Sequence, residues 1–336
     1  MLKMSESAKA EYWLGFDLGA TKMLSTVFDE EFRPLARKRK KTKGQSGAKV
    51  VIERIIETAR ETLSELQLSE KRLGGIGVGV PGPVDQEKGI VLEAANLGWK
   101  KVKLAEILEA EFDCPVVVLN DVDAGVYGEY RFGAARSTRT AIGVFPGTGI
   151  GGGCVYNGEI LHGKGKSCME IGHVQVTPNG HFCGCGLRGC LETEASRLAI
   201  SAQAAMAAYR GEAPHLLAEA GTDLTNIRSS VLANAIEAGD RVIEQIVRRA
   251  ANYLGQVIAS VVHLIAPDVV VLGGGMIEAM PHLFVPTIFE SANNHVLPSF
   301  QNSFKVLQAK LGDDAAVMGA AAWAARHPTK LTPVRP

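Results

Sequence analysis

One short stretch of the sequence gathers side chains that bind metal ions. Cys183, Cys185 and Cys190 fall within eight residues, and His173 lies shortly before them. Thiolate sulfur and imidazole nitrogen are the ligands that tetrahedral Zn²⁺ prefers, and four protein ligands leave no position for water. We therefore expect a structural zinc ion at these residues. A redox pair or buried thiols are the alternative interpretation.

Three glycine-rich segments have the composition needed to hold phosphate groups. Glycine permits positive φ and close approach of the backbone, so N–H groups at a strand end can point at an anion. None is a Walker A loop or a dinucleotide-binding loop, and one glycine cluster alone often marks an ordinary turn. The candidate phosphate-binding residues are Gly19, Thr21 and Lys22, then Gly147, Thr148 and Gly149, then Gly273, Gly274 and Gly275.

Two aspartates follow apolar segments that are typical of buried strands. Asp17 adjoins the first glycine segment, where a carboxylate would face the Mg²⁺ that accompanies ATP. Asp121 follows Asn120, and a carboxylate there could take the proton of an acceptor hydroxyl, which is worth about 10²–10⁴-fold in rate. Alternatively, Asn120 and Asp121 cap the following helix, a role that can coexist with catalysis.

The elements that must position these residues form two α/β halves of comparable plan. Each half is expected to hold a mixed sheet flanked by helices. The expected domains are residues 1–120 and 121–313, with a last helix at about 314–330 packing back on the first domain. Strands are predicted at 12–17, 23–28, 37–43, 75–80, 116–119, 140–145 and 269–272, and helices at 48–66, 195–209, 240–266 and 315–325.

The composition favours a small-molecule partner. Lys and Arg total 36 and Asp and Glu also total 36, so no overall positive field draws the chain to nucleic acid or to a membrane. The basic run 38–41 is interpreted as a solvated edge strand. Residues 1–10 have no apolar stretch of signal-peptide type, and six cysteines in 336 residues do not form a dense disulfide framework. We expect a cytoplasmic protein.

Taken together, the motifs resemble the ROK family (repressor, open reading frame, kinase), within the larger group of sugar kinases built like hexokinase and actin. They occur in the family's order and span about residues 12–325. The matching stretches are residues 16–22, 79–85, 96–99, 120–121, 147–153, 170–173, 183–186 and 189–192.

The resemblance implies a two-lobed actin-like ATPase (ribonuclease H-like) fold, with a mixed β-sheet flanked by helices in each lobe. It implies an ATP-dependent hexose kinase, most simply a glucokinase that makes glucose 6-phosphate, whose lobes close over the sugar. It also implies a homodimer or homotetramer. ATP, Mg²⁺ and structural Zn²⁺ are the expected cofactors, and the hexose and ATP are the expected partners.

The resemblance also assigns a sugar site. It places the catalytic aspartate at Asp121. If one nitrogen of His173 binds zinc while the other contacts the sugar, the metal fixes the orientation of this ring. The residues implied to contact the ring hydroxyls are Glu170, His173 and Glu192, completed by Asn96, Asn120 and Gly82.

Some positions depart from the family pattern and leave the identity of the sugar open. Asp123 stands where Asn is more usual, Gly125 where Ala is usual, and residues 166–169 replace small residues. Kinases of N-acetylglucosamine, N-acetylmannosamine, fructose or allose are the alternatives, and polyphosphate is an alternative donor. A sugar-binding protein without activity is another.

A transcriptional repressor of the same family is a different class of function. Such repressors carry an N-terminal helix-turn-helix domain of some sixty or more residues. Only about 11 residues precede the first expected strand here, so the sequence favours the kinase over the repressor.

Overall fold

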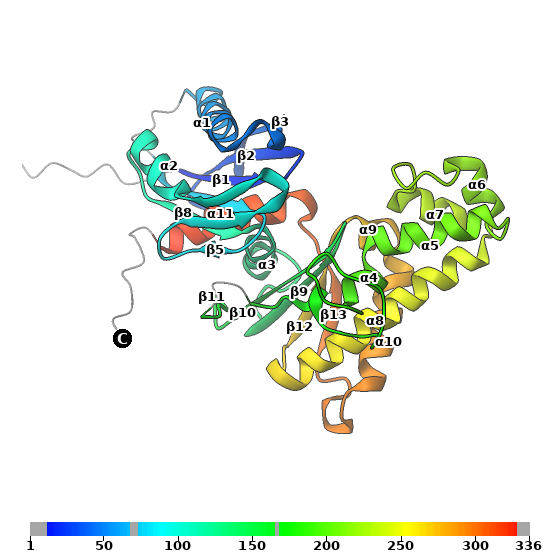
Figure 1. Cartoon of the computed structure of the whole chain (residues 1–336). Helices are drawn as coiled ribbons and strands as arrows, with labels where there is room; N and C mark the ends of the chain where they lie inside the picture. The colour runs from blue at the N-terminus through cyan, green and yellow to red at the C-terminus, as the bar shows by residue number, and fades with distance from the viewer. Residues whose placement is uncertain (1–11, 68–72, 165–167, 328–336) are drawn as a thin grey trace, which may run out of the picture. The chain divides into compact units, whose positions relative to one another are not determined.

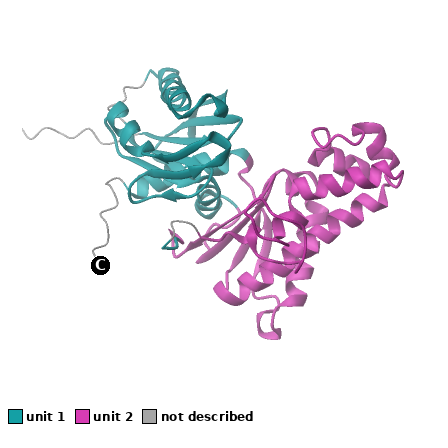
Figure 2. Ribbon diagram, viewed as in Figure 1, with its two compact units in different colours: residues 1–133, 162–167, 313–336 teal, residues 134–161, 168–312 magenta. Residues whose placement is uncertain are grey.

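The computed structural model describes residues 12–67, 73–164 and 168–327 of the chain (Figure 1). These residues form two compact units (Figure 2). The first unit runs to Gly133 and also includes the segment around His162 and the chain from Asp313 onward. The second unit consists of Ala134–Leu161 and Cys168–Gly312.

The first unit is built on a five-stranded mixed sheet with the order β3-β2-β1-β4-β8. The first three strands form an antiparallel meander, whereas β1, β4 and β8 are parallel. The carboxyl ends of these parallel strands therefore lie at one edge of the sheet. The strands are β1 (Tyr12–Leu18), β2 (Lys22–Phe28), β3 (Pro34–Lys41), β4 (Leu73–Val80) and β8 (Val116–Asn120).

Helices cover this sheet because their apolar residues recur on one face. In α1 the buried residues Val51, Ile55, Ala59 and Leu63 follow helical spacing. A small sheet, β5-β6-β7, lies between β4 and α2 in the sequence. The remaining elements are α1 (Ala48–Ser64), β5 (Val84–Asp85), β6 (Ile90–Ala94), β7 (Trp99–Val102), α2 (Leu104–Phe112), α3 (Asp121–Arg131) and α11 (Ala315–Arg326).

The first unit extends past the expected boundary at Asn120. Helix α3, which follows β8, packs extensively against α11 and therefore belongs to the first unit. Helix α11 also packs on β1 and β4. The end of its expected range, residues 328–330, lies outside the described residues.

The basic strand β3 is the edge strand of the sheet, as its composition predicted. Alternate side chains point to opposite faces, and acidic residues neutralise both faces. On the α1 side, Lys38 Nζ lies 2.6 Å from Glu65 Oε1. On the α11 side, the Arg39 guanidinium lies 2.6 Å from Asp313 Oδ2. Most of the positive charge of this run therefore serves the fold.

Helix α11 approaches both strand β4 and helix α3 so closely that glycines are required at the two contacts. A Cβ atom on Gly77 of β4 would lie 1.9 Å from the carbonyl oxygen of Ala320, and one on Gly319 would lie 1.8 Å from that of Ala124. Both obstacles are backbone atoms, which cannot rotate away. Gly77 is therefore the position in β4 where α11 lies directly against the strand.

We predict that Gly77→Ala destabilises the protein by about 3 kcal/mol, because α11 must shift away from β4. The matched control is Gly79→Ala in the same strand, where the nearest atoms lie at an ordinary 3.5 Å. Urea unfolding of both variants measures the difference. Equal free energies of unfolding would contradict the close packing described here.

The second unit repeats the topology of the first. Its sheet has the order β11-β10-β9-β12-β13, with an antiparallel meander followed by two strands parallel to β9. The repeated plan inferred from the sequence is therefore present in the strand order. The strands are β9 (Thr140–Pro146), β10 (Ile150–Tyr156), β11 (Glu159–Ile160), β12 (Val269–Leu272) and β13 (Lys305–Gln308).

Helices carry most of the core of the second unit. Helix α8 buries a continuous stripe of apolar residues and ends before Pro267, which disfavours helix in the residue preceding it. The helix expected at 195–209 is interrupted at Ser196, whose hydroxyl accepts a hydrogen bond from Ala199 N and caps α5. The helices are α4 (Leu191–Ala195), α5 (Arg197–Tyr209), α6 (Pro214–Ala220), α7 (Ser229–Glu237), α8 (Arg241–Ile265), α9 (Gly275–Ala279) and α10 (Pro281–His295).

Within the described residues, no helix combines the length and apolar character needed to cross a membrane.

Candidate active site and metal centre

Asn120 links the end of β8 to two neighbouring segments. Its Oδ1 accepts hydrogen bonds from Val122 N at 2.9 Å and Asp123 N at 3.2 Å, so it caps helix α3 as the sequence allowed. Its Nδ2 donates to the Gly82 carbonyl oxygen at 3.1 Å. The side chain of Asn120 therefore holds the turn after β4 beside the start of α3.

Asp121 begins α3 at the carboxyl edge of the sheet, and Asp17 lies in β1 near the same edge. Strand register pairs Asp17 with Gly79, and Val80 with Asn120. Desolvation by the surrounding protein is the largest cause that raises the pKa of Asp17 to about 7, and the negative charges of Asp121 and Asp313 add to it. The two carboxylates thus influence each other electrostatically.

Burial also raises the pKa of Asp121, to about 6, although the hydrogen bond from Val122 N opposes this shift. A carboxylate with so high a pKa is a stronger base than one in water, yet it is still ionised at neutral pH. This combination suits a group that accepts a proton from a hydroxyl.

The first glycine segment, Gly19–Thr21, is held by the residues that follow β3. Thr42 Oγ1 donates to the Gly19 carbonyl oxygen at 2.7 Å, and Thr42 N donates to that of Thr21 at 2.8 Å. This turn borders a pocket of about 860 Å³ in the first unit, which Asn96 also lines. Thr21, a candidate for phosphate, and Asn96, a candidate for sugar, therefore share one pocket.

In the second unit, the glycine segment after β9 lies against Glu192. Ile150 N donates to Glu192 Oε2 at 3.1 Å, and a Cβ on Gly149 would lie only 2.3 Å from the same oxygen. A larger residue at position 149 would therefore displace the carboxylate of Glu192. Glu192, a candidate for sugar binding, thus contacts the candidate phosphate loop.

Arg197 also anchors this loop, and the sequence analysis missed it. Its backbone N–H donates to the Gly147 carbonyl oxygen at 2.8 Å, and its guanidinium donates to Thr148 Oγ1 at 3.0 Å. A single arginine after a helix cap carries no distinctive sequence signal. Its role becomes visible because the α4–α5 junction lies beside the loop.

The third glycine segment joins β12 to α9 and lies beside the second. Gly274 has φ of 90°, and a Cβ there would lie 2.8 Å from the carbonyl oxygen of Pro146, the residue before Gly147. Gly273 N donates to the Val144 carbonyl oxygen at 3.1 Å. The fold therefore brings together two glycine segments that are far apart in the sequence.

The four residues expected to bind zinc converge. The ligand atoms of His173, Cys183, Cys185 and Cys190 all lie within 4.8 Å of one another. Cys183 Sγ lies 3.6 Å from His173 Nδ1, and Cys185 Sγ lies 3.7 Å from Cys190 Sγ. One imidazole and three sulfurs at this spacing fit the ligand set of a tetrahedral zinc ion.

The chemistry of the thiols also fits a cation. Burial, together with the neighbouring cysteines, raises the pKa of the Cys190 thiol to about 12. The pKa of the Cys185 thiol is instead lowered, chiefly by a backbone hydrogen bond with Leu187, and a bound cation would stabilise the thiolate form of all three cysteines. Cys183 Sγ also lies 3.6 Å from Glu192 Oε1, so the cysteine cluster contacts a candidate sugar ligand.

Glu170 and His173 occupy one tight turn. Glu170 precedes the 3-10 helix Ile171–His173, and its carbonyl oxygen accepts a hydrogen bond from His173 N at 3.0 Å. Met169, one of the residues that depart from the family pattern, has a positive φ of 56° immediately before Glu170. Lys166 and Ser167 of the same segment lie outside the described residues.

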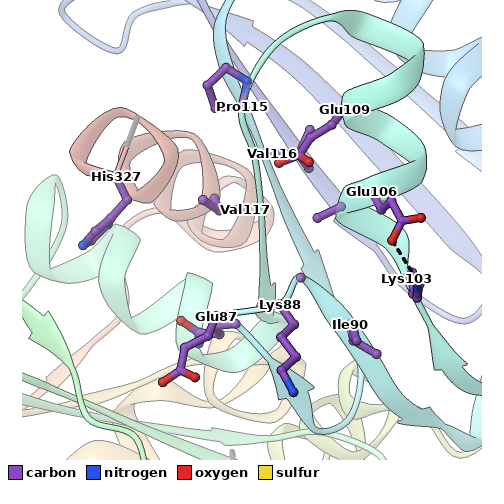
Figure 3. Close-up of a pocket in the computed structure, with 13 residues that line it drawn as sticks. Glu87, Lys88, Ile90, Lys103, Glu106, Glu109, Pro115, Val116, Val117 and His327 are labelled. Carbon is purple, nitrogen blue, oxygen red and sulfur yellow. Dashed lines mark hydrogen bonds and ion pairs between the residues drawn. The ribbon is translucent and has the colours of Figure 1, made fainter. Parts of the chain in front are cut away.

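A second cavity in the first unit lies away from these residues. It has a volume of about 310 Å³ and opens beside Pro115 and Val116, at the start of β8, whereas Asp121 follows the end of that strand (Figure 3). Its lining mixes carboxylates with lysines, including the ion pair of Lys103 and Glu106. None of the predicted site residues lines it.

The repeated sheets define an α/β protein with the actin-like ATPase fold. The chain belongs to the ROK family, whose model matches residues 13–327.

Three comparisons relate the chain to proteins of known activity or structure. It is 34% identical over 310 residues to a glucokinase of Thermotoga maritima, covering 92% of this chain and 95% of that protein. The crystal structure of a ROK family glucokinase from Streptomyces griseus in complex with glucose and AMPPNP has a TM-score of 0.80 and 30% identity, covering 94% of this chain and 99% of that one. A xylose repressor of Bacillus spizizenii is 26% identical over 319 residues, covering 95% of this chain and 78% of the repressor.

Proposed function

We propose that this protein is an ATP-dependent glucokinase, which transfers the γ-phosphoryl group of ATP to glucose and yields glucose 6-phosphate and ADP. The observation that carries the proposal is Asp121, a carboxylate with a pKa of about 6 at the end of β8. The similarity to glucokinases over nearly the whole chain supports the choice of substrate and donor.

In this proposal Asp121 accepts the proton of the sugar hydroxyl as that oxygen bonds to the γ-phosphorus atom. Asn120 positions Asp121 by capping α3 and by bonding to Gly82. The rest of catalysis is positioning and charge stabilisation, because phosphoryl transfer leaves little covalent work for the protein.

The donor is assigned to the glycine segments. Gly147–Gly149 and Gly273–Gly275 lie side by side in the second unit, and Arg197 and Glu192 hold the first of them in place. Gly19, Thr21 and Lys22 are assigned to the terminal phosphates. Asp17 would hold the Mg²⁺ of the nucleotide, directly or through water, which compensates charge on the phosphates.

The ring hydroxyls of the sugar are assigned to the polar residues that the family resemblance points to. Carboxylates, amides and an imidazole suit a polyol, whose hydroxyls each donate and accept. The assigned residues are Glu170, His173 and Glu192, completed by Gly82, Asn96 and Asn120.

His173, Cys183, Cys185 and Cys190 would hold a structural zinc ion. The ion would fix the tautomer and orientation of His173 and, through Cys183, the position of Glu192. In this way the metal would shape the sugar site without taking part in the reaction.

The same observations distinguish the kinase from the repressors of the family. The higher identity to glucokinases than to the xylose repressor, together with Asp121, favours the kinase. Kinases of N-acetylated hexosamines, fructose or allose share the proposed chemistry. A homodimer or homotetramer and a cytoplasmic location are part of the proposal.

The test is a coupled assay of ADP formation over a panel of hexoses, with ATP and with polyphosphate as donors. We expect the highest kcat/KM with glucose and ATP, because a polar site reads each hydroxyl and rejects analogues that leave its groups unpaired. A higher kcat/KM with another hexose would replace glucose as the substrate. No turnover with any hexose would contradict the kinase itself.

A further inference from the structure

Three lysines at one end of the first sheet, Lys22, Lys41 and Lys43, differ from the neighbouring lysines of β3 because they form no ion pair within the described residues. Lys38 and Lys40 of β3 form ion pairs with Glu61 of α1. Within the described part of the chain, the ammonium groups of Lys22, Lys41 and Lys43 have no such partner. Acidic partners therefore neutralise the lysines within β3 but not Lys41 at its end.

The strand register makes this arrangement unfavourable for folding alone. Lys22 of β2 lies directly opposite Lys41 of β3, so both side chains project from the same face. Like charges in such a cross-strand pair destabilise a sheet. Arg54 adds a third positive charge, because its guanidinium donates to the Lys41 carbonyl oxygen at 2.7 Å.

Two of these lysines lie beside the candidate site. Lys41 and Lys43 line the pocket of about 860 Å³, together with Thr21 and Asn96. The 3-10 helix Gly44–Ser46, which follows Lys43, forms the next part of the wall of this pocket.

The 3-10 helix Gly44–Ser46 packs closely against the backbone of Ala20 on one side and of Asn96 on the other. A Cβ on Gly44 would lie 3.0 Å from the Ala20 carbonyl oxygen and 3.2 Å from that of Asn96. Lys43 itself adopts a left-handed conformation, with φ of 56°. The backbone around the lysines is therefore tied to the turn at Gly19–Thr21, which is assigned to phosphate.

We propose that Lys41 and Lys43, assisted by Lys22, form a subsite for a multiply charged phosphoryl group. Two sources share this chemistry: the terminal phosphate of the donor before transfer, and the phosphate ester of the sugar product after it. The inference rests on the proposed glucokinase function, because that function supplies both ligands. In either case the uncompensated lysines balance the charge of the phosphoryl group as it approaches or leaves Asn96.

The experiment compares the wild type with a Lys41→Met, Lys43→Met double variant. Methionine keeps the length and the apolar stem of lysine but removes its charge. The control is Lys49→Met, an exposed lysine just after the same wall, in the first turn of α1. Steady-state kinetics give the KM for ATP, the KM for glucose and the inhibition constant of glucose 6-phosphate.

A donor subsite predicts a KM for ATP at least about fivefold higher in the double variant, with product inhibition unchanged. A product subsite predicts the same rise in the inhibition constant of glucose 6-phosphate, with the KM for ATP unchanged. In both cases the affected constant should depend less on salt than in the wild type. If neither constant changes beyond that of the Lys49→Met control, the subsite is refuted while the kinase proposal stands.

Should the wild type phosphorylate no hexose, the subsite can still be judged separately. Calorimetric titration with inorganic tripolyphosphate measures anion binding without turnover. Weaker binding to the double variant than to the control would support the subsite, and equal binding would overturn it.

Discussion

Asp121→Ala should lower kcat by about 10²–10⁴-fold while glucose binding changes little, because the variant removes the proposed proton acceptor and leaves the rest of the sugar site. Removal of a buried carboxylate also leaves a small void at the start of α3. Binding should therefore be measured directly, by calorimetric titration with glucose, alongside kcat from the coupled assay.

Asp121→Asn is the matched control for shape. It keeps the volume of the side chain but cannot accept a proton from the hydroxyl, so its kcat should fall nearly as far. An Asn variant with wild-type kcat would mean that another group is the base.

The same residue predicts a pH dependence of two kinds. A carboxylate acts as a base only when it is ionised. With a pKa of about 6 for Asp121, the log kcat/KM of the enzyme should fall with unit slope below about pH 6. The free energy of unfolding changes with pH in the opposite direction to kcat/KM. The folded-state pKa lies above the ordinary value of 3.8, so the folded protein holds the proton more tightly and becomes less stable as pH rises from about 4 to about 6.

Asp121→Asn should therefore unfold at a higher temperature than the wild type at about pH 8 and show a smaller difference at about pH 4. A substitution that costs activity but raises stability is typical of a catalytic group in a desolvated site. Thermal unfolding at the two pH values measures this. A variant less stable than the wild type at both would contradict the raised pKa.

Removal of the metal should have the second large effect. Dialysis against a strong chelator is expected to lower the melting temperature by several degrees or more, because a structural zinc ion contributes binding free energy to folding. It should also raise the KM for glucose, since His173 belongs to the cluster and Cys183 contacts Glu192 at 3.6 Å. The readouts are metal content, thermal unfolding and the KM for glucose.

Cysteine variants separate the metal from the thiols. Cys190→Ala, which removes a buried ligand, should reproduce the chelated state and lower the zinc content from about one ion per chain. Cys168→Ser changes a cysteine outside the cluster and should retain the metal. The zinc assignment fails if the purified protein holds no metal, or if a chelated protein keeps its melting temperature and its KM.

The sequence was sufficient for most elements and for the family. The strand at 269–272 and the helix at 240–266 could be predicted within a residue or so, because periodic burial and flanking Gly or Pro are local signals. The metal cluster was also readable, because its ligands follow one another closely in the chain. Asn120 as a helix cap was another local signal.

Features that depend on contacts between distant segments were not readable. Arg197 supports the loop at Gly147 across about fifty residues, and Glu192 occupies the space beside Gly149. The domain boundary lay beyond Asn120 because α3 packs on α11, which follows almost two hundred residues later. The ion pairs of Lys38 and the lack of one at Lys41 among the described residues likewise depend on where α1 and the residues just before α11 place their carboxylates. Local residue types specify elements and ligand sets, whereas packing across the fold specifies which charges and backbone groups meet.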